Sequence, residues 1–584
     1  MTYENTNGNA PLRDGTDGRM TAERTVSLWS AHEGHEHDSI GLVVSGSLTE
    51  GLEIRLDDRV LPSDVIVGTY VTIDAGTRRF FGMIKDIKLC TTIAQLAHTP
   101  PGPDEDFLRE VYQGTAVFGM LQVQPMLQIN DVDGEGRAPE PVKSVPPHFS
   151  RVRLSTQEEI ERIFGTEDGR HFVIGTPLDM EVKVRLDYKR FIERSNGVFG
   201  KSGTGKTFLT RLLLLNTIQK SNSQKEQKDK AVCLVFDMHN EYGWKGTSED
   251  EHREVPGLKR ILGSDVAVYT LDSESSKLRN SYPDGEIVIG LDQIEPDDMK
   301  LLQETMGLSD NAVDACEALY EKFQEEWFRN ALELQITEKG EEDPTSRQLN
   351  IHAASVRNLK RALQKFKRGK DFIVDKAPED VLASLLKTLE NGRSVVIEFG
   401  RYGSDLDAYM LVANILTRRI HDRWREKTEK ALGTGGEHPI HLIIVIEEAH
   451  KFLDPAVAGH TIFGQIAREM RKYNVTLLVI DQRPSAIDPE VMSQFGTRIT
   501  CLLDNERDIE AVLSGVSGKS GLRDVLARLD SKQQALILGH AVPMPIVVRP
   551  ETYDQTTYAR FRESLRSSQP AKSDPSDDSD LFIN

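Results

Sequence analysis

Residues 197–208 carry the sequence Gly197-Val198-Phe199-Gly200-Lys201-Ser202-Gly203-Thr204-Gly205-Lys206-Thr207-Phe208, which contains a complete G-x-x-x-x-G-K-[ST] pattern. Gly197 to Phe199 predict a buried strand, and the leucine-rich run after Phe208 predicts a helix with an apolar face. A glycine-rich loop between a strand and a helix presents backbone N–H groups and the positive end of the helix to phosphate. We therefore predict a site for a nucleoside triphosphate at this loop.

The same pattern assigns roles to single side chains. Lys206 is expected to reach the β- and γ-phosphate oxygens and to act in catalysis, while the hydroxyl of Thr207 is expected to bind Mg²⁺. The predicted cofactors are therefore ATP and Mg²⁺. The residues of this loop predicted to bind the nucleotide are Gly200, Lys201, Ser202, Gly203, Thr204, Gly205, Lys206, Thr207 and Phe208.

Hydrolysis also needs acidic groups at the end of a neighbouring strand, and Glu447 and Glu448 follow the apolar run Leu442–Ile446. We expect Glu447 to hold Mg²⁺, directly or through water, and Glu448 to orient and deprotonate the attacking water. Gln482 follows another apolar run and is a candidate sensor of the γ-phosphate or of water; the alternative is that it caps the next segment.

The charge that develops on the transferred group needs a cation besides Lys206 and Mg²⁺. Arg468 and Arg471 lie three residues apart on a predicted helix and therefore share a face. Either is a candidate to reach the site of a neighbouring subunit, and a plain surface helix is the alternative. Arg483 is a third candidate and is also predicted to contact the nucleotide.

Apolar runs alternate with helical stretches after residue 186, which predicts an α/β fold with a parallel sheet covered by helices on both faces. Short alternating runs before it, with a hairpin signal at Ala75-Gly76-Thr77, predict a small β-barrel. The predicted parts are a disordered leader at 1–24, an N-terminal partner-binding β-barrel at 25–185, the first part of the ATPase core at 186–294, a helical insertion at 295–390, the second part of the core at 391–564 and an acidic flexible tail at 565–584.

Composition narrows the class of protein. The 584 residues predict two or three domains, and the longest apolar runs are too short to span a bilayer, so we expect a soluble cytoplasmic protein, associated with the nucleoid. A net charge of −20 argues against a surface that is basic everywhere. Any surface that binds nucleic acid must then be local, such as the inside of a ring.

Three smaller sequence patterns each allow two interpretations. Lysine and arginine recur along residues 360–370 of the predicted insertion, either as a solvated helix face or as a contact for phosphates. His32, His35 and His37 are better explained by a polar loop than by zinc. The cysteines predict reduced thiols rather than bridges; they are Cys90, Cys233, Cys316 and Cys501.

Several of these features together resemble the HerA family: the predicted barrel, the glycine-rich loop, Phe236-Asp237-Met238-His239-Asn240-Glu241-Tyr242, Glu447-Glu448-Ala449-His450 and Gln482-Arg483-Pro484-Ser485. The resemblance covers most of residues 25 to 560. It implies a RecA-like ATPase of the FtsK-HerA division with a HerA/ATP-synthase-type barrel. It also implies the roles given above for Lys206, Thr207, Glu447, Glu448 and Gln482, and it places Asp237, His239 and Glu241 near the nucleotide.

Two positions depart from the family pattern. Asp481 stands where a small hydroxyl residue is common, and Met470 replaces the glycine often found between the paired arginines. These departures concern the sensor and the trans arginine, whereas the loop at Gly200–Thr207 is complete.

The resemblance implies a homo-hexameric DNA translocase or helicase that moves duplex DNA through its channel and works in DNA end resection, repair or phage defence. Its expected partner is a nuclease such as NurA, or another effector, on the barrel face. The alternative is an ATP-gated ring scaffold that assembles and activates an effector nuclease without sustained translocation. Conjugation-type and division-type DNA pumps usually carry membrane helices, and no such segment is evident in the sequence.

Overall fold

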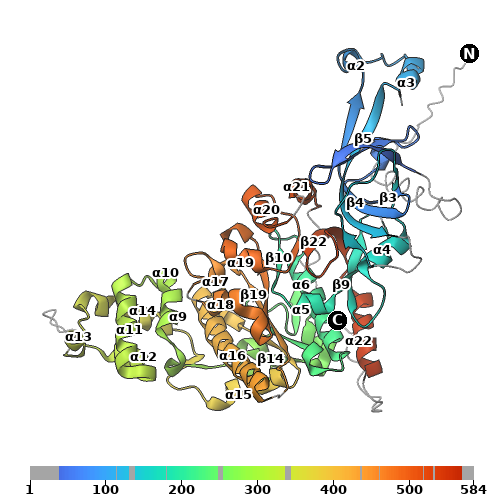
Figure 1. Ribbon diagram of the computed structural model, residues 1–584. Coiled ribbons are helices and arrows are strands. Elements are labelled where there is room, and N and C mark those ends of the chain that lie inside the picture. Colours follow the sequence, from blue (N-terminus) through green and yellow to red (C-terminus); the bar gives the residue numbers. More distant parts are fainter. Residues whose placement is uncertain are drawn as a thin grey trace, which may run out of the picture. The chain divides into compact units, whose positions relative to one another are not determined.

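The computed structural model describes residues 39–568, except for 114, 131–137, 179, 248–253, 336–343, 435–436, 460, 517–518 and 531–532. The chain forms two compact units (Figure 1), unit 1 with Met1–Glu159 and Leu178–Glu181, and unit 2 with Ile160–Pro177 and Val182–Asn584. The predicted leader and the histidine-rich patch lie outside the described residues. Within the described residues, no helix is long and apolar enough to cross a membrane.

Unit 1 is built on a closed antiparallel barrel. Six strands form the ring because β5 pairs back onto β2, and β6 adds to the outer side of β5. The alternating burial along β5 places Leu121, Val123, Leu127 and Ile129 inside, as expected for a strand with one face toward a barrel core. In sheet order the strands are β2 (Gly51–Leu56), β1 (Gly41–Ser47), β7 (Arg151–Leu154), β3 (Tyr70–Ala75), β4 (Arg78–Thr91), β5 (Val117–Asn130) and β6 (Glu140–Pro141).

The hairpin predicted at Ala75-Gly76-Thr77 is confirmed, since β3 and β4 pair antiparallel around it. Gly76 has φ 71°, a left-handed conformation that glycine adopts at no steric cost. Between the long strands β4 and β5 the chain forms two short helices, α2 (Ala94–His98) and α3 (Asp106–Tyr112).

Unit 2 contains a twelve-stranded sheet, eight strands of which run parallel from β15 to β21. The last four add antiparallel. In sheet order the strands are β15 (Gly285–Glu286), β14 (Val266–Thr270), β18 (Ser394–Glu398), β11 (Ala231–Asp237), β19 (His441–Glu447), β20 (Val475–Asp481), β10 (Asn196–Phe199), β21 (Thr497–Thr500), β22 (Ala535–Gly539), β23 (Ile546–Pro550), β8 (His171–Pro177) and β9 (Val184–Asp187). This arrangement confirms the predicted α/β class with an added barrel.

The barrel ends earlier than the predicted boundary at residue 185. Strands β8 and β9 belong to the large sheet, because β8 pairs antiparallel with β23 at the far end of the chain. Alternating apolar residues predict a strand but do not determine which strand it pairs with. At the other end, α22 continues to Ser568, past the predicted start of the tail at 565, and the residues after Ser568 lie outside the described part of the chain.

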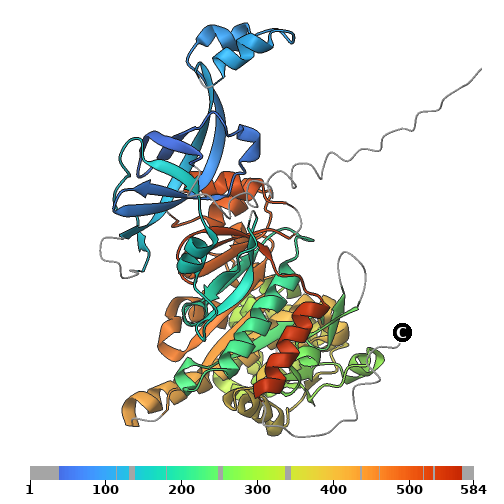
Figure 2. The same ribbon diagram turned by 90° about the vertical axis from the view of Figure 1, so that its right-hand side faces the viewer.

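The helices of unit 2 pack on the sheet and on one another, and Figure 2 shows α22, in red, beside the green helix α6. Helix α6 is buried almost all round, which suits its wholly apolar leucine run. The helices outside the insertion are α5 (Tyr188–Ile192), α6 (Lys206–Asn222), α7 (Leu258–Leu262), α8 (Ser273–Leu278), α16 (Leu406–Thr434), α17 (His450–Leu453), α18 (Ile462–Glu469), α19 (Pro489–Gln494), α20 (Glu506–Val512), α21 (Lys519–Ala527) and α22 (Gln555–Ser568), and α4 (Gln157–Phe164) spans the division between the units.

The helical insertion is present between the strands of the large sheet, and Figure 1 shows α11, α12, α13 and α14 gathered together at one end of unit 2. A two-stranded pairing of β16 (Ile289–Gly290) with β17 (Ile373–Val374) closes its base. Its helices are α9 (Pro296–Leu301), α10 (Gln303–Met306), α11 (Asp310–Phe323), α12 (Trp327–Glu333), α13 (Pro344–Gln348), α14 (Ala353–Lys367) and α15 (Glu379–Glu390).

The order of the central strands determines where the chemistry lies. Strand β20 separates β19, which ends in Glu447, from β10, which leads into the glycine-rich loop. Because these strands are parallel, their carboxyl ends meet at one edge of the sheet. Glu448, Gln482 and the loop therefore face the same region although the sequence separates them widely.

Candidate active site

A polar cavity of about 170 Å³ lies at this edge of the sheet. It brings together side chains from the loop after β10, the turn after β11 and the ends of β19 and β20. Its lining residues are Ser202, Gly203, Lys206, Thr207, His239, Glu241, Glu447, Glu448, Ile480, Asp481 and Gln482. The cavity thus collects the predicted phosphate-binding, metal-binding and catalytic groups in one place.

The glycine-rich loop has a shape that depends on three glycines with positive φ, namely Gly200 (156°), Gly203 (77°) and Gly205 (86°). A Cβ at Gly200 would lie 2.8 Å from the Thr204 hydroxyl oxygen, so only glycine fits there. At Gly203 and Gly205 no atom lies within 4 Å of such a Cβ, and the loop therefore surrounds open space. The Nζ of Lys206 donates to the carbonyl oxygen of Lys201 at 2.7 Å, back along the loop.

Glu447 is a buried carboxylate with one satisfied and one unsatisfied oxygen. The hydroxyl of Tyr242 donates to Oε1 at 2.9 Å, whereas Oε2 has no hydrogen-bond partner among the described residues. The hydroxyl of Tyr409 also bonds the backbone N and O of Glu447, each at 3.0 Å, which fixes the end of β19. Burial, together with the nearby carboxylate of Asp237, raises the pKa of Glu447 to about 8.

Glu448, the next residue, has a left-handed backbone with φ 49°. A residue other than glycine held in this region costs about 1–3 kcal/mol and persists only where its surroundings hold it. The Nε2 of Gln482 donates to Oε1 of Glu448 at 2.9 Å, and the Nδ1 of His450 lies 3.6 Å from Oε2. The turn therefore directs adjacent carboxylates to different partners, Glu447 to Tyr242 and Glu448 to Gln482.

Asp481 holds the ends of β19 and β20 together. Its buried carboxylate accepts from the backbone N of His450 at 2.6 Å and lies 3.0 Å from the ring Nδ1 of the same residue. It also accepts from the backbone N of Arg483 at 2.6 Å. The contact between Asp481 and His450 was not predicted from the sequence, although a carboxylate directly after the apolar strand and before Gln482 is a signal for it.

The turn after β11 contributes two side chains to the cavity and one that shapes the turn. Asp237 is fully buried and accepts from the backbone N of Glu241 and of Tyr242 at 2.7 and 2.8 Å. It does not line the cavity, whereas His239 and Glu241 do. Burial raises the pKa of Glu241, and the guanidinium of Arg211, 3.9 Å away, opposes this shift.

Comparisons of the sequence with known proteins agree with this geometry. The sequence model of the helicase HerA central domain matches residues 172–420, and that of the HAS barrel domain matches residues 40–132. The chain is 24% identical to the DNA double-strand break repair helicase HerA of Sulfurisphaera tokodaii, over 88% of this chain and 93% of that protein. The chain belongs to the HerA family of ATPases. The Sulfolobus acidocaldarius protein of the same name is 26% identical, over 72% of this chain and 76% of its own.

Solved structures with a similar chain path include VirB4 of Thermoanaerobacter pseudethanolicus, with 16% identity, a TM-score of 0.41, and 66% of this chain and 98% of that chain covered. The plasmid coupling protein TrwB in complex with ADP and Mg²⁺ has 12% identity and a TM-score of 0.42, with 69% of this chain and 94% of that chain covered.

Two of the candidate arginines of this HerA-family ATPase, Arg468 and Arg483, do not line the cavity of their own chain. Arg468, on α18, has its Nε 3.3 Å from Glu490 and lines a separate cavity of about 460 Å³ with residues of α16 and α18. Arg483 is exposed at the end of β20. Arg471 lies outside the residues whose side chains the structure describes.

The ring of Phe208 packs in an aromatic cluster of the HerA-family core, and its contact with the nucleotide stays a prediction. Its ring lies 5.7 Å from that of Tyr553, and the guanidinium of Arg211 lies 5.3 Å from the Phe208 ring. Arg211 also faces the ring of Tyr242 at 5.9 Å. Through Arg211 the cluster connects α6 to Tyr242, whose hydroxyl donates to Glu447. The sequence alone does not predict this contact.

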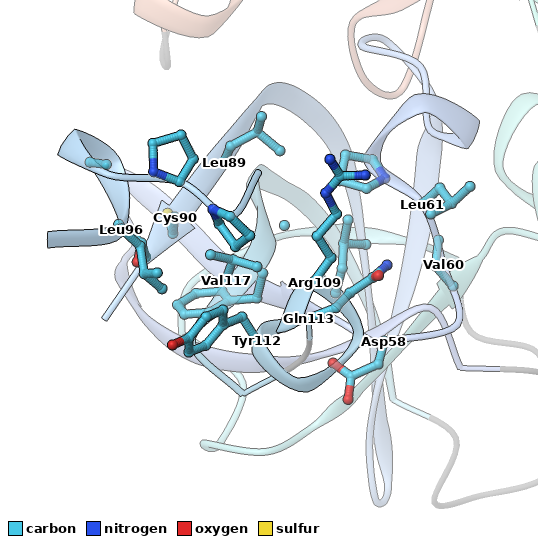
Figure 3. A pocket seen from close by; sticks show the side chains of 18 of the residues that line it. Asp58, Val60, Leu61, Leu89, Cys90, Leu96, Arg109, Tyr112, Gln113 and Val117 are labelled. Atoms are coloured by element: carbon cyan, nitrogen blue, oxygen red, sulfur yellow. The ribbon is translucent and has the colours of Figure 1, made fainter. Parts of the chain in front are cut away.

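A larger cavity, of about 480 Å³, lies in unit 1 of the HerA-family chain and is lined mainly by apolar side chains (Figure 3). Figure 3 shows Leu89, Leu96, Val117, Tyr112 and Arg109 around it, from β4, β5 and the two short helices between them. Leu89 is 84% exposed. The charged side chains in its described lining are Asp57, Asp58 and Arg109.

Proposed function

We propose that this HerA-family ATPase is an ATP-driven DNA translocase or helicase that forms a hexameric ring and moves duplex DNA through its channel. In this proposal it works in the cytoplasm at the nucleoid, with a nuclease partner, in end resection and repair or in phage defence. The observation that supports it most directly is the cavity shared by Lys206, Thr207, Glu447, Glu448 and Gln482.

The described residues fit a nucleotide with Mg²⁺. The open space around Gly203 and Gly205 suits phosphate oxygens, and the free Oε2 of Glu447 beside Thr207 suits a hard cation. Thr207 and Glu447 would hold Mg²⁺, which supplies charge neutralisation at the phosphates when bound. A bound cation also favours the ionised form of Glu447, which burial disfavours.

Each polar side chain of the cavity has a distinct task in this proposal. Lys206 leaves the carbonyl of Lys201 and binds the phosphates. Glu448 accepts a proton from the attacking water at its carboxylate, and the amide of Gln482, 2.9 Å from that carboxylate, orients it. His450, held by Asp481, keeps the second oxygen of Glu448 in place.

Relatives support the DNA substrate, because the matched HerA proteins of Sulfurisphaera tokodaii and Sulfolobus acidocaldarius are named DNA double-strand break repair helicases. The hexamer is supported by an incomplete site: Arg468 and Arg483 do not line the cavity of their own chain, although hydrolysis needs a further cation. A neighbouring subunit would supply Arg468, Arg471 or Arg483.

The nuclease partner is supported by the exposed apolar surface of unit 1. Leu89 lines the cavity of Figure 3 and is 84% exposed, and Phe107, on α3, is 74% exposed. Contiguous apolar surface of this kind marks sites of contact between proteins. NurA or another effector docked on the barrel face would cover it.

The experiment is steady-state ATP hydrolysis by the purified chain, with and without long duplex DNA, beside Glu448→Gln. A general base contributes about 10²–10⁴-fold, so the variant should lose hydrolysis by that factor while still binding ATP. Asp488→Asn, at the cap of α19 outside the cavity, serves as a control for a lost carboxylate. Native mass spectrometry with ATP tests the hexamer.

The outcomes separate the proposals. Hydrolysis that duplex DNA stimulates in the wild type but not in Glu448→Gln would support the translocase. Hydrolysis indifferent to DNA, with assembly that depends on ATP, would favour the ring scaffold. Full activity in Glu448→Gln would mean that another group is the base.

A further inference from the structure

The exposed face of α14 carries a row of four basic residues, called here the basic stripe: Arg357, Arg361, Lys365 and Arg368. Their spacing of four, four and three residues keeps them on one side of the helix and its C-terminal cap. All four are exposed. None of their side chains forms an ion pair or a hydrogen bond with a described residue.

The helix is held so that this face points outward. Its other side buries Val356, Leu359, Leu363 and Phe366, which pack against α11 and α12 of the insertion. The Oδ1 of Asn358 accepts from the backbone N of Ser309 at 3.0 Å, which fixes the rotation of α14 about its own axis. The basic stripe therefore belongs to an anchored helix and cannot turn toward the core.

Five other basic residues of the insertion have partners. Lys360 donates to the carbonyl of Leu334 at 2.7 Å, Lys367 lies 2.9 Å from Asp375, and Lys370 lies 2.8 Å from Asp405. Lys322 donates to Gln348, and Arg329 pairs with Glu326. The local structure thus accounts for these five cations, but not for the four of the basic stripe.

Simpler structural explanations do not account for all four cations of the basic stripe. Cations in the last turn of a helix interact favourably with its dipole, which suits Lys365 and Arg368 but not Arg357 and Arg361, which lie before the last turn. Like charges four residues apart destabilise a helix by about 0.2–0.5 kcal/mol per pair. In a chain with a net charge of −20, a row of like cations on one fixed face favours an anionic ligand.

We propose that the basic stripe binds the phosphate backbone of duplex DNA, as a contact separate from the nucleotide cavity. The four side chains cover about 16 Å along the helix at intervals of about 6 Å, which suits successive phosphates rather than a single one. The same face offers only Gln364 between the cations and Ala354 before the first of them. It lacks an aromatic side chain that could stack on unpaired bases, so it fits a duplex backbone better than a single strand.

This inference rests on the proposed function and gives the helical insertion a task within it. The insertion interrupts the core between β16 and β18, so DNA held on α14 would be attached to the unit that hydrolyses ATP. Phosphate contacts carry no sequence information. The stripe would therefore strengthen binding to all duplexes alike.

The test compares two triple variants of the full-length chain. One removes three cations of the stripe, as Arg357→Ala, Arg361→Ala and Lys365→Ala. The matched control removes three partnered cations of the same insertion, as Lys322→Ala, Arg329→Ala and Lys367→Ala. Binding to a fluorescein-labelled, mixed-sequence duplex is measured by anisotropy over a range of KCl concentrations. Basal ATP hydrolysis without DNA checks that both variants are folded.

The slope of log K against log salt should become shallower by about 0.9 for each lost phosphate contact, hence by about 2 to 3 in the stripe variant. The control should keep the wild-type slope. A wild-type protein that binds duplex with the same slope as the stripe variant would overturn the inference and leave the proposed function standing; an acidic protein would then be the better partner. A wild-type protein that binds no duplex at all would overturn both.

Discussion

Glu159 in unit 1 and Glu447 in unit 2 are both buried glutamates, and their surroundings are opposite. Glu159 accepts from Arg153 at 2.9 and 2.7 Å and from Arg79 at 2.9 Å. It also accepts from the hydroxyl of Thr72 at 2.8 Å. Glu447 accepts at its side chain only from Tyr242, and its Oε2 has no described partner.

The pKa values of the two carboxyls diverge accordingly. Burial alone would raise the pKa of Glu159, but the hydrogen bonds and charge of Arg153, with help from the Thr156 N–H, lower it to about 2. Burial and the carboxylate of Asp237 raise the pKa of Glu447 to about 8. A buried carboxylate with cationic and hydrogen-bonding partners inside the protein stabilises the folded state. A buried carboxylate that lacks a partner is suited to bind a cation from solution.

The largest expected effect follows from removing the charge of Glu447. Glu447→Gln keeps the size of the side chain and its acceptor for Tyr242 but removes the metal-binding charge. Because metal ions supply several kcal/mol to phosphoryl transfer, Mg²⁺-dependent ATP hydrolysis should fall about a thousandfold or more. Thermal stability without nucleotide should stay the same or rise, since burial disfavours the lost charge.

Glu398→Gln is the matched control for that variant. Glu398 ends β18, which β11 separates from β19 in the same sheet, and it is buried. Its oxygens accept from Trp244 and Arg279, and it does not line the cavity. Its substitution should affect stability rather than hydrolysis. If Glu447→Gln hydrolysed ATP as well as Glu398→Gln does, the metal-binding role of Glu447 would be wrong.

The second effect is on folding and concerns unit 1. Glu159→Gln leaves the guanidinium of Arg153, whose side chain is 6% exposed, without its main counter-charge. Removing one partner of a buried ion pair costs about 3–5 kcal/mol, so the melting temperature of unit 1 should drop. Differential scanning calorimetry of the full chain measures this drop, with the exposed neighbour Glu158→Gln as a neutral control. An unchanged transition would show that Arg153 finds other partners.

The third effect is the pH dependence of that difference. The pKa of Glu159 is lower in the folded chain than its ordinary value of 4.5, so its contribution is present above about pH 4.5 and lost as pH falls toward 2. The shift corresponds to about 3 kcal/mol. Melting temperatures of wild type and Glu159→Gln should therefore converge between pH 4.5 and 2. Curves that stay parallel throughout this range would contradict the lowered pKa.

The smallest effect comes from the hydroxyl that bonds Glu447. Tyr242→Phe removes the donor to Oε1 while keeping the ring that faces Arg211. Loss of a group that orients a metal ligand typically weakens metal binding about 10–100-fold. The Mg²⁺ concentration for half-maximal hydrolysis should rise by that factor. Tyr269→Phe, whose hydroxyl bonds Ser384 and Thr388, should leave it unchanged.

Much of the site followed from local sequence because local chemistry determines it. The glycines of the loop need positive φ, and apolar strands that end in Glu447 and Asp481 place carboxylates at the same edge of a parallel sheet. The cavity confirms that Lys206, Glu448 and Gln482 meet, although their catalytic roles remain predictions.

The structural features that could not be predicted from the sequence depend on contacts between residues that are distant in the chain. The barrel boundary depended on β23 reaching β8, and alternation alone cannot select a pairing partner. Tyr242 and Tyr409 belong to different elements and meet only at Glu447. Tertiary packing also gives Asp237 and Phe208 partners that the sequence does not predict, in a turn and in an aromatic cluster, while their nucleotide contacts stay predictions.

The sequence by itself determined the chemical groups and the strands that carry them. The conformation of a glycine-rich loop and the pattern of an apolar strand depend on residues that are close together in the chain. Only the tertiary structure decided which buried glutamate would be neutralised by Arg153 and which would keep a free oxygen at the cavity. The physical reason is that the pKa and partners of a buried charge depend on every group within a few ångströms, whichever part of the chain supplies it.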